Sequence, residues 1–257
     1  MCARCGDRLP WPDSSAAADL CRACRLVPPP FVRAVAFGLY DGRMRDAVHA
    51  LKYDRLHPAA RRLGQMLAQA IAQLAADAPQ EMLAVPVPLH RSKYAERGFN
   101  QARALAASAL AALRKSHPAW RLTLASSTLM RLRATESQAG LSPHRRGINV
   151  RGAFSVSDPA AVAGKHILLI DDIFTTGATA RAAARSLVRA GAASVWVATL
   201  ARARMIAPAR GPQTFDDDTD SPLAIAAPEV NFESGSTGPV STEHTASMHS
   251  SGNQPSF

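Results

Sequence analysis

Hydrophobic and polar positions follow two different periods along residues 31–207, and these predict strands and helices in turn. Short apolar segments bounded by Gly, Pro or polar residues have the length of strands, and they lie at 34–40, 82–88, 122–129, 153–156, 166–170 and 194–200. Apolar residues at helical spacing predict helices at 42–53, 59–76, 98–114 and 177–190. Strands that alternate with helices favour an α/β fold with a mostly parallel sheet flanked by helices.

The two ends of the chain differ from this alternating region. Residues 1–27 contain all four cysteines, and a stiff linker of three prolines, Pro28 to Pro30, follows them. Residues 208–257 hold 23 Ser, Thr, Pro and Gly and few large apolar side chains, a composition typical of disorder. We therefore expect three parts: a four-cysteine module at 1–27, an α/β domain at 31–207 and a disordered acidic tail at 208–257.

Charge is spread unevenly over these parts. The whole chain has a net charge of +10, but residues 208–257 carry seven acids and one base, which leaves a net charge of +16 on residues 1–207. Such a charge attracts polyanions, either phosphate-rich substrates or nucleic acid. Heavy use of Arg and Ala is the alternative explanation, because it indicates a GC-rich genome, and only four of the 30 bases are Lys.

The sequence also bears on where the protein is located. Its longest apolar runs are shorter than the roughly 18 residues that span a bilayer, and Met1 to Cys5 has no signal-peptide apolar core. We expect a soluble, cytoplasmic protein without membrane insertion.

The four cysteines form two Cys-x2-Cys pairs, Cys2 with Cys5 and Cys21 with Cys24, with 15 residues between the pairs. Each pair can direct two thiolates from one tight turn to a single ion, and two such turns complete a tetrahedral Zn²⁺ site. A site closed by four thiolates is structural, since it leaves no position for a substrate. Two disulfides are the alternative, which a cytoplasmic location disfavours.

A pair of carboxylates follows one of the predicted strands directly. Ile167 to Ile170 is continuously apolar, Asp171 and Asp172 come next, and a Thr/Gly loop then leads into a helix from about Ala178. Open α/β sheets bind ligands at the carboxyl ends of their strands, and a helix N-terminus favours phosphate. Two carboxylates beside it can accept hydrogen bonds from a diol or hold a hydrated Mg²⁺.

Other proteins also place paired acids after a strand. A Walker B element does so, but no G-x-x-x-x-G-K-[ST] sequence occurs in this chain. A receiver domain carries its acid pair after the first strand of a short domain, whereas this pair lies past residue 170. An ordinary strand with a polar end and a helix N-cap remains the simplest alternative.

The 13 residues from Ile167 to Thr179 resemble the PRPP-binding motif of type I phosphoribosyltransferases, PRPP being 5-phosphoribosyl 1-pyrophosphate. Further segments extend the resemblance to the ComF family, whose members accompany DNA uptake in naturally competent bacteria. In chain order these segments are the two Cys-x2-Cys pairs, Leu51-Lys52-Tyr53, Val85-Pro86-Val87-Pro88-Leu89 and Arg97-Gly98-Phe99-Asn100-Gln101. The resemblance covers about residues 1–204.

This resemblance implies a type I phosphoribosyltransferase fold with an N-terminal zinc ribbon, and roles for individual residues. Asp171 and Asp172 would hold the ribose hydroxyls, directly or with Mg²⁺. Residues of the following loop would bind the 5′-phosphate: Thr175, Thr176, Gly177, Ala178 and Thr179. Val87 would lie in the pyrophosphate loop, and Lys52 and Arg97 are candidates for pyrophosphate contact. The Arg-rich segment 131–149 resembles the flexible loop that closes over PRPP, with an exposed connector as the alternative.

Two functions remain open from the sequence. The first is transfer of phosphoribosyl from PRPP, with Mg²⁺, to an acceptor that the sequence does not identify. The second is a catalytically weak adaptor that binds PRPP or single-stranded DNA within the DNA-uptake machinery. A DNA-uptake helicase is a further partner implied by the resemblance. The acidic tail is expected to compete with DNA for the basic surface of residues 1–207.

Overall fold

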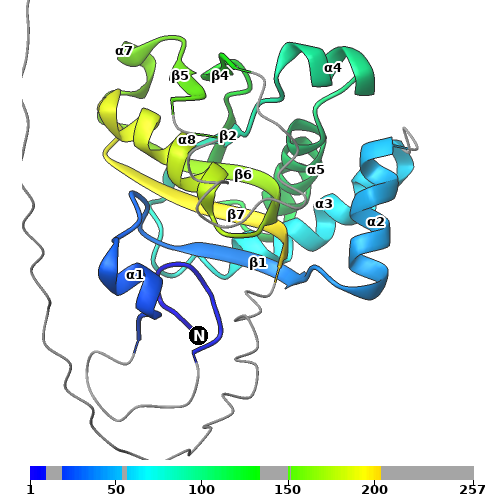
Figure 1. The fold of residues 1–257 in the computed structure, drawn as a ribbon, viewed down its shortest axis with the longest axis horizontal. Helices are drawn as coiled ribbons and strands as arrows, with labels where there is room; N and C mark the ends of the chain where they lie inside the picture. The colour runs from blue at the N-terminus through cyan, green and yellow to red at the C-terminus, as the bar shows by residue number, and fades with distance from the viewer. Residues whose placement is uncertain (10–18, 54–56, 134–149, 151, 204–257) are drawn as a thin grey trace, which may run out of the picture. The chain divides into compact units, whose positions relative to one another are not determined.

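The computed structural model describes residues 1–9, 19–53, 57–133, 150 and 152–203, all of which belong to one compact unit (Figure 1). The predicted tail at 208–257 lies outside the described residues, as do positions 134–149 of the predicted closing loop. Among the described residues, no helix is both long and apolar enough to cross a membrane.

A five-stranded sheet forms the centre of this unit, and every neighbouring pair of its strands is parallel. The strand order is β1-β7-β6-β2-β3. The bounds are β1 Ala34–Leu39, β2 Glu81–Pro86, β3 Arg121–Leu124, β6 His166–Phe174 and β7 Ser194–Arg202. Two short strands outside this sheet, β4 Leu129–Arg131 and β5 Phe154–Val156, pair antiparallel. The predicted α/β fold with a parallel sheet flanked by helices is confirmed.

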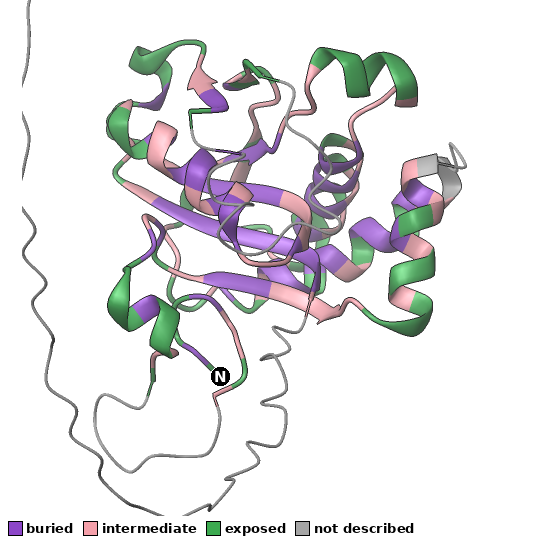
Figure 2. Cartoon of the chain, viewed as in Figure 1, coloured by how far each residue is buried: buried purple, intermediate pink, exposed green. Residues whose placement is uncertain are grey.

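Helices cover both faces of the sheet, because the central strands are apolar on both sides. Leu168 and Ile170 of β6 pack with α2 (Gly42–Tyr53), α3 (His57–Ala72) and α5 (Gln101–Ser116). Ile167 and Leu169 point the other way and pack with α8 (Ala178–Arg189), with β5 and with the cysteine segment. All four β6 side chains are fully buried, and Figure 2 shows the buried residues concentrated on the sheet and on the inner sides of the helices.

The sheet differs from the sequence prediction in two places. The strand expected to end at Ile170 continues through both acids to Phe174, because β7 runs beside it to Arg202 and pairs with Asp171, Ile173 and Phe174. The strand expected at 122–129 is two strands, β3 and β4, which belong to different sheets.

The helix expected from Gly98 begins later, at Gln101. Gly98 instead ends a short helix, α4 (Arg91–Arg97), with a backbone φ of +79° that favours glycine. The Asn100 side chain then accepts a hydrogen bond of 3.2 Å from the Arg103 amide and caps α5. The segment therefore turns the chain between two helices. Two other short helices, α1 (Arg22–Leu26) and α7 (Pro159–Val162), were also not expected.

Candidate functional site

The acid pair lies near the carboxyl end of β6, beside the loop that follows β2. The Val87 amide donates a 2.8 Å hydrogen bond to the carbonyl of Ile170, the residue before the pair. The Asn100 side-chain amide donates a 3.1 Å hydrogen bond to the Val87 carbonyl. The structure therefore brings the predicted pyrophosphate loop and the predicted ribose-binding acids to one edge of the sheet. The sequence placed Asn100 in a family motif but gave it no role. In the structure, its side chain binds this loop through the hydrogen bond to Val87.

The Thr/Gly loop connects β6 to α8 and presents the start of that helix. Gly177 precedes α8 with φ of +74°, and a Cβ at this position would lie 2.6 Å from the Phe174 ring. Only glycine fits both constraints. The Ala178 amide is 3.4 Å from the Thr176 hydroxyl, and a small hollow beside these residues is also lined by Asp171. The start of α8 thus presents backbone amides with hydroxyls nearby, an arrangement that favours an anion.

Lys52, from the last turn of α2, forms an ion pair with Asp172. The Lys52 Nζ lies 2.9 Å from Asp172 Oδ2, and the two side chains are only 19% and 15% exposed. Burial alone would lower the pKa of Lys52, but the charge of Asp172 and the hydrogen bond to it outweigh burial and raise that pKa. Burial alone would raise the pKa of Asp172, and Lys52 reverses this and lowers it. Both groups are therefore charged at neutral pH.

Asp171 has the opposite protonation behaviour. Burial raises its pKa to about 8, and the neighbouring charge of Asp172 acts in the same direction. A hydrogen bond of 2.9 Å from the Asp172 amide to Asp171 Oδ1 opposes the shift only in part. Near pH 7 the pair therefore carries about one negative charge in the absence of a ligand. A cation or a diol that favours the ionised form can draw the second proton off.

Two arginines, Arg97 and Arg131, also belong to the surroundings of the acid pair. Burial lowers the pKa of Arg131, and Asp171 and Arg97 are the two charges that act on it, in opposite directions. An Arg97 nitrogen is 3.4 Å from the side-chain oxygen of Gln101, which is 2% exposed. Of the two arginines, only Arg97 was predicted from the sequence as a candidate for pyrophosphate contact. Arg131 was missed as an individual site residue, since it appeared only as the first position of a long Arg-rich segment.

The four cysteines, all near the N-terminus, come together in space. Their sulfur atoms all lie within 4.8 Å of one another, and the Cys5 and Cys21 sulfurs are 3.7 Å apart. Four sulfurs bound at about 2.3 Å to one tetrahedral zinc ion would be roughly 3.8 Å apart. A disulfide requires about 2.0 Å, and none of the four cysteines forms one. The donor set and its spacing therefore fit a closed zinc site.

Comparison with known proteins agrees with this architecture. The model of the family described as "Phosphoribosyl transferase domain" matches residues 96–228, so the chain belongs to that family. A "DNA utilization protein YhgH" of Salmonella typhi is 35% identical over 204 residues, covering 79% of this chain and 84% of the relative. "Competence protein F" of Haemophilus influenzae is 26% identical with the same coverage, and "Competence protein ComFC" of Bacillus subtilis is 40% identical over 119 residues, 46% of this chain and 43% of that protein.

Within the phosphoribosyltransferase superfamily, these relatives place the chain in the ComF family. The family resemblance inferred from the sequence is confirmed, and so is the fold class with a four-cysteine cluster compatible with a zinc ribbon. The roles assigned to individual residues stay predictions. For Lys52 in particular, the structure shows an ion pair with Asp172, and a contact with pyrophosphate is still to be tested.

The raised pKa of Asp171 predicts how the stability of the ligand-free protein depends on pH. An unfolded Asp ionises near 3.8 and folded Asp171 near 8, so unfolding between these values releases a proton. From this group alone, the free energy of unfolding should fall by up to about 1.4 kcal/mol for each unit by which the pH rises within that range. Asp171→Asn should remove this slope, as measured by urea unfolding between about pH 5 and pH 8.

The matched control for this measurement is Asp46→Asn, which changes an exposed carboxylate on α2. That variant should keep the pH dependence of the original protein. An Asp171→Asn variant with the same slope as the control would show that Asp171 ionises normally in the fold.

The sulfur geometry predicts one tightly held zinc ion per chain. Cys21→Ser should lose it, because three thiolates and a hydroxyl make a much weaker site. Metal analysis of protein purified without chelator measures the number of zinc ions per chain. The control is Ala23→Ser, which changes an exposed residue between Cys21 and Cys24. Zinc-free protein, or two disulfides seen by non-reducing mass spectrometry, would contradict the prediction.

Proposed function

We propose that this protein binds PRPP with Mg²⁺ at the carboxyl edge of its sheet. The observation that carries the proposal is the juxtaposition of the half-buried Asp171–Asp172 pair with the glycine-capped start of α8, on a chain of the phosphoribosyltransferase family. Asp171 and residues of this loop line the same small hollow, so a ribose hydroxyl and a 5′-phosphate could be bound by neighbouring parts of the chain.

Each part of the ligand has a matching part of the site. The loop residues 175–179 offer backbone amides and hydroxyls to the 5′-phosphate. Asp171 and Asp172 accept hydrogen bonds from the ribose hydroxyls, and Lys52 keeps Asp172 ionised for this purpose. The Val87 loop and the guanidinium of Arg97, both near the acid pair, would bind the pyrophosphate, whose charge needs both amide donors and cations.

The reaction implied by this family is displacement of pyrophosphate from C1 of the ribose. As the bond to pyrophosphate breaks, C1 gains oxocarbenium character, and no protein nucleophile is needed. The chain's part is to hold the two ends of the sugar and to surround the leaving group with fixed donors and positive charge. Mg²⁺, when bound with PRPP, neutralises negative charge on the pyrophosphate. The acceptor that attacks C1 is still to be identified.

The acid pair gives the sharpest test of this proposal. Asp171→Asn combined with Asp172→Asn keeps the shape of both side chains and removes their charges. Hydrogen bonds to charged groups contribute about 1.5–3 kcal/mol each, so losing two predicts PRPP binding weaker by roughly 100-fold or more. Isothermal titration calorimetry with PRPP and Mg²⁺ measures this directly.

The control variant for that titration combines Asp46→Asn with Asp158→Asn, which removes two carboxylates that are both exposed. It should bind PRPP like the original chain, and circular dichroism should show that both double variants are folded. If the Asp171/Asp172 variant binds PRPP undiminished, the acids do not hold the ribose and the assignment is wrong.

Binding and turnover are separate questions for this site. Pyrophosphate release from PRPP, assayed against a panel of bases and amines, selects the transferase. Binding without release against any acceptor selects the adaptor. The names of the relatives, DNA utilization and competence proteins, support a role in handling DNA for either function. The helicase partner, the cytoplasmic location and the three-part division of the chain stay predictions.

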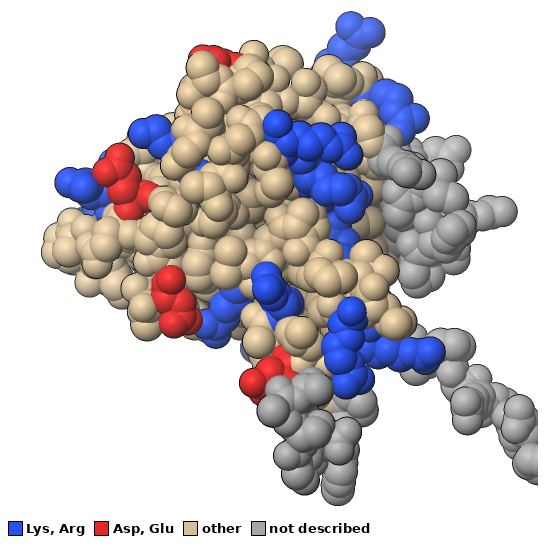
Figure 3. All heavy atoms as spheres, turned by 90° about the vertical axis from the view of Figure 1, so that its left-hand side faces the viewer, with Lys and Arg blue, Asp and Glu red and all other residues tan. Residues whose placement is uncertain are grey.

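We further propose that single-stranded DNA binds to a basic surface beside the cysteine segment. Arg185 and Arg189 lie one turn apart on α8, with Arg189 exposed, and Arg22 and Arg25 of α1 are exposed close to the first turn of that helix. Figure 3 views this side of the molecule and shows Lys and Arg side chains spread over it, with Asp and Glu patches mainly toward its edges. A row of cations along a helix favours a phosphate backbone without reading its sequence.

The salt dependence of DNA binding distinguishes binding at this surface from attraction to the net positive charge of the protein. Arg22→Ser with Arg189→Ser should weaken binding of an oligothymidylate and reduce the log–log salt slope by about 0.7 for each phosphate that is no longer neutralised. Arg114→Ser with Lys115→Ser removes the same charge from exposed positions at the end of α5 and should change both quantities less. Equal effects of the two double variants in a fluorescence anisotropy titration would assign the binding to net charge alone.

A further inference from the structure

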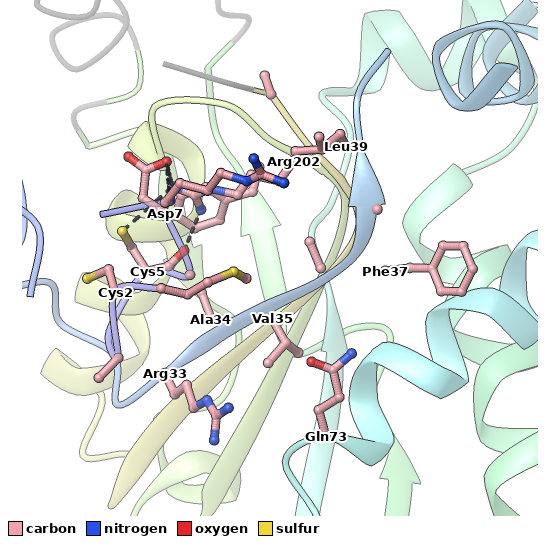
Figure 4. A pocket seen from close by; sticks show the side chains of 18 residues that line it. Cys2, Cys5, Asp7, Arg33, Ala34, Val35, Phe37, Leu39, Gln73 and Arg202 are labelled. Carbon is pink, nitrogen blue, oxygen red and sulfur yellow. Dashed lines mark hydrogen bonds and ion pairs between the residues drawn. The ribbon is translucent and has the colours of Figure 1, made fainter. Parts of the chain in front are cut away.

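Arg202, at the end of β7, reaches out of the sheet to the first cysteine pair (Figure 4). Its guanidinium donates to the backbone carbonyl of Cys5, lies 3.6 Å from the Cys5 sulfur and is 3.6 Å from a carboxylate oxygen of Asp7. The residue is only 8% exposed. A buried arginine directed at a metal-ligating sulfur is expected where thiolate charge has to be offset.

Arg181, in the first turn of α8, makes the corresponding contact to the second cysteine pair. Its guanidinium donates a 2.9 Å hydrogen bond to the Val27 carbonyl and lies 3.7 Å from the Cys24 sulfur. The backbone amide of Arg181 donates a 2.8 Å hydrogen bond to the carbonyl of Gly177, the cap of the helix. One residue therefore joins the sulfur cluster to the loop proposed to hold phosphate.

Phe174 connects Arg202 to the same loop. The Arg202 guanidinium lies 4.6 Å from the centre of the Phe174 ring, an arrangement typical of a cation–π contact. The ring also fills the space beside Gly177 that a Cβ would occupy, so it supports the loop directly. Phe31, just after the cysteine segment, meets this ring edge-on with centroids 6.2 Å apart. A shift of the cysteine segment would therefore move the ring that supports the loop.

The cysteine segment is not packed tightly against the sheet along its whole length. A cavity of about 440 Å³ separates its first pair from β1, with Cys2, Cys5 and Arg202 on its walls (Figure 4). A backbone hydrogen bond from Ala34 to Arg4 bridges the two parts beside this cavity. The two arginines thus add polar contacts to the apolar packing that joins the cysteine segment to the sheet.

We infer that Arg202 and Arg181 are positioning residues that couple the zinc site to the phosphate-binding loop. Zinc fixes the four sulfurs, the two arginines bind the fixed cysteines, and Phe174 and Gly177 are held in the conformation that receives the 5′-phosphate. Because coupling between two sites is reciprocal, PRPP should slow the loss of zinc as zinc strengthens the binding of PRPP. The inference rests on the proposed function for its ligand, while the mechanical link is testable without any ligand.

Hydrogen exchange of the ligand-free, zinc-loaded protein tests the link itself. In Arg202→Gln, amides of the peptide that spans residues 174–181 should exchange several-fold faster, while peptides of α3 and α5 stay protected. Arg114→Gln, which removes an exposed charge from α5, should leave the loop unchanged. A purely structural role of Arg202 would lower the melting temperature without a selective change in the loop, and that result overturns the inference.

The same variants are then titrated with PRPP and Mg²⁺ and challenged with a chelator. We expect Arg202→Gln to retain zinc, to bind PRPP about 10-fold more weakly and to lose the protection of zinc that PRPP gives the original chain. Arg202→Lys keeps the charge without the forked donor and should recover only part of the affinity. If Arg202→Gln does not fold, Arg181→Gln tests the same link from the helix.

The two hypotheses fail in different ways. An original chain that shows no PRPP binding ends the proposed function, and the exchange experiment still decides the coupling. An original chain that binds PRPP, with variants that bind equally well and exchange equally slowly in the loop, ends the coupling and leaves the proposed function standing.

Discussion

Two carboxylates next to each other on a buried strand cannot both be ionised unless a cation lies beside them. In this fold Lys52 neutralises Asp172, and Asp171 is left with a pKa raised to about 8. Near pH 7 the ligand-free acid pair therefore retains one proton, mainly on Asp171, at the place where a ligand is expected to bind. This arrangement depends on the sheet and its covering helix together, since β6 carries the acids and α2 carries the lysine.

The surrounding architecture holds these partly exposed acids in a fixed position. β6 is the central strand of a parallel sheet that is covered on both faces, so neighbouring strands and packed side chains hold it on every side. Its hydrogen bonding with β7 continues past the acids as far as Phe174, which makes the pair part of a strand rather than of a loop. A site on a strand end is held more firmly than one on a connection, and only the Thr/Gly turn that follows lies outside the ladder.

The local order of residues was enough to predict most of the elements and the position of the acids. Continuous apolar runs, prolines and helical spacing are short-range signals, so α2 was predicted with its observed bounds and β1 to within one residue. The extent of β6 was not predictable in this way. The strand continues past Asp172 because it pairs with β7, and the paired residues of β7 lie nearly 30 positions further along the chain. The Lys52–Asp172 pair and the Asn100–Val87 hydrogen bond depend likewise on which elements the fold brings together. The short helix α4 was missed since its sequence, Arg91 to Arg97, is almost entirely polar.

The cysteine cluster shows a different limit of sequence reasoning. Its spacing predicted a metal site that the sulfur geometry fits, but it gave no reason why the cysteine segment should contact the sheet where it does. The structure supplies that reason through charge: a zinc ion bound by four thiolates carries a net charge of −2, and an arginine approaches each cysteine pair. Arg202 lies 197 positions from Cys5, at the opposite end of the described chain, so the two ends of the fold are joined through this cluster. Phe174 ends β6 and Arg181 lies in the first turn of α8, so the side chains beside the sulfur cluster also flank the Thr/Gly loop that we propose binds phosphate.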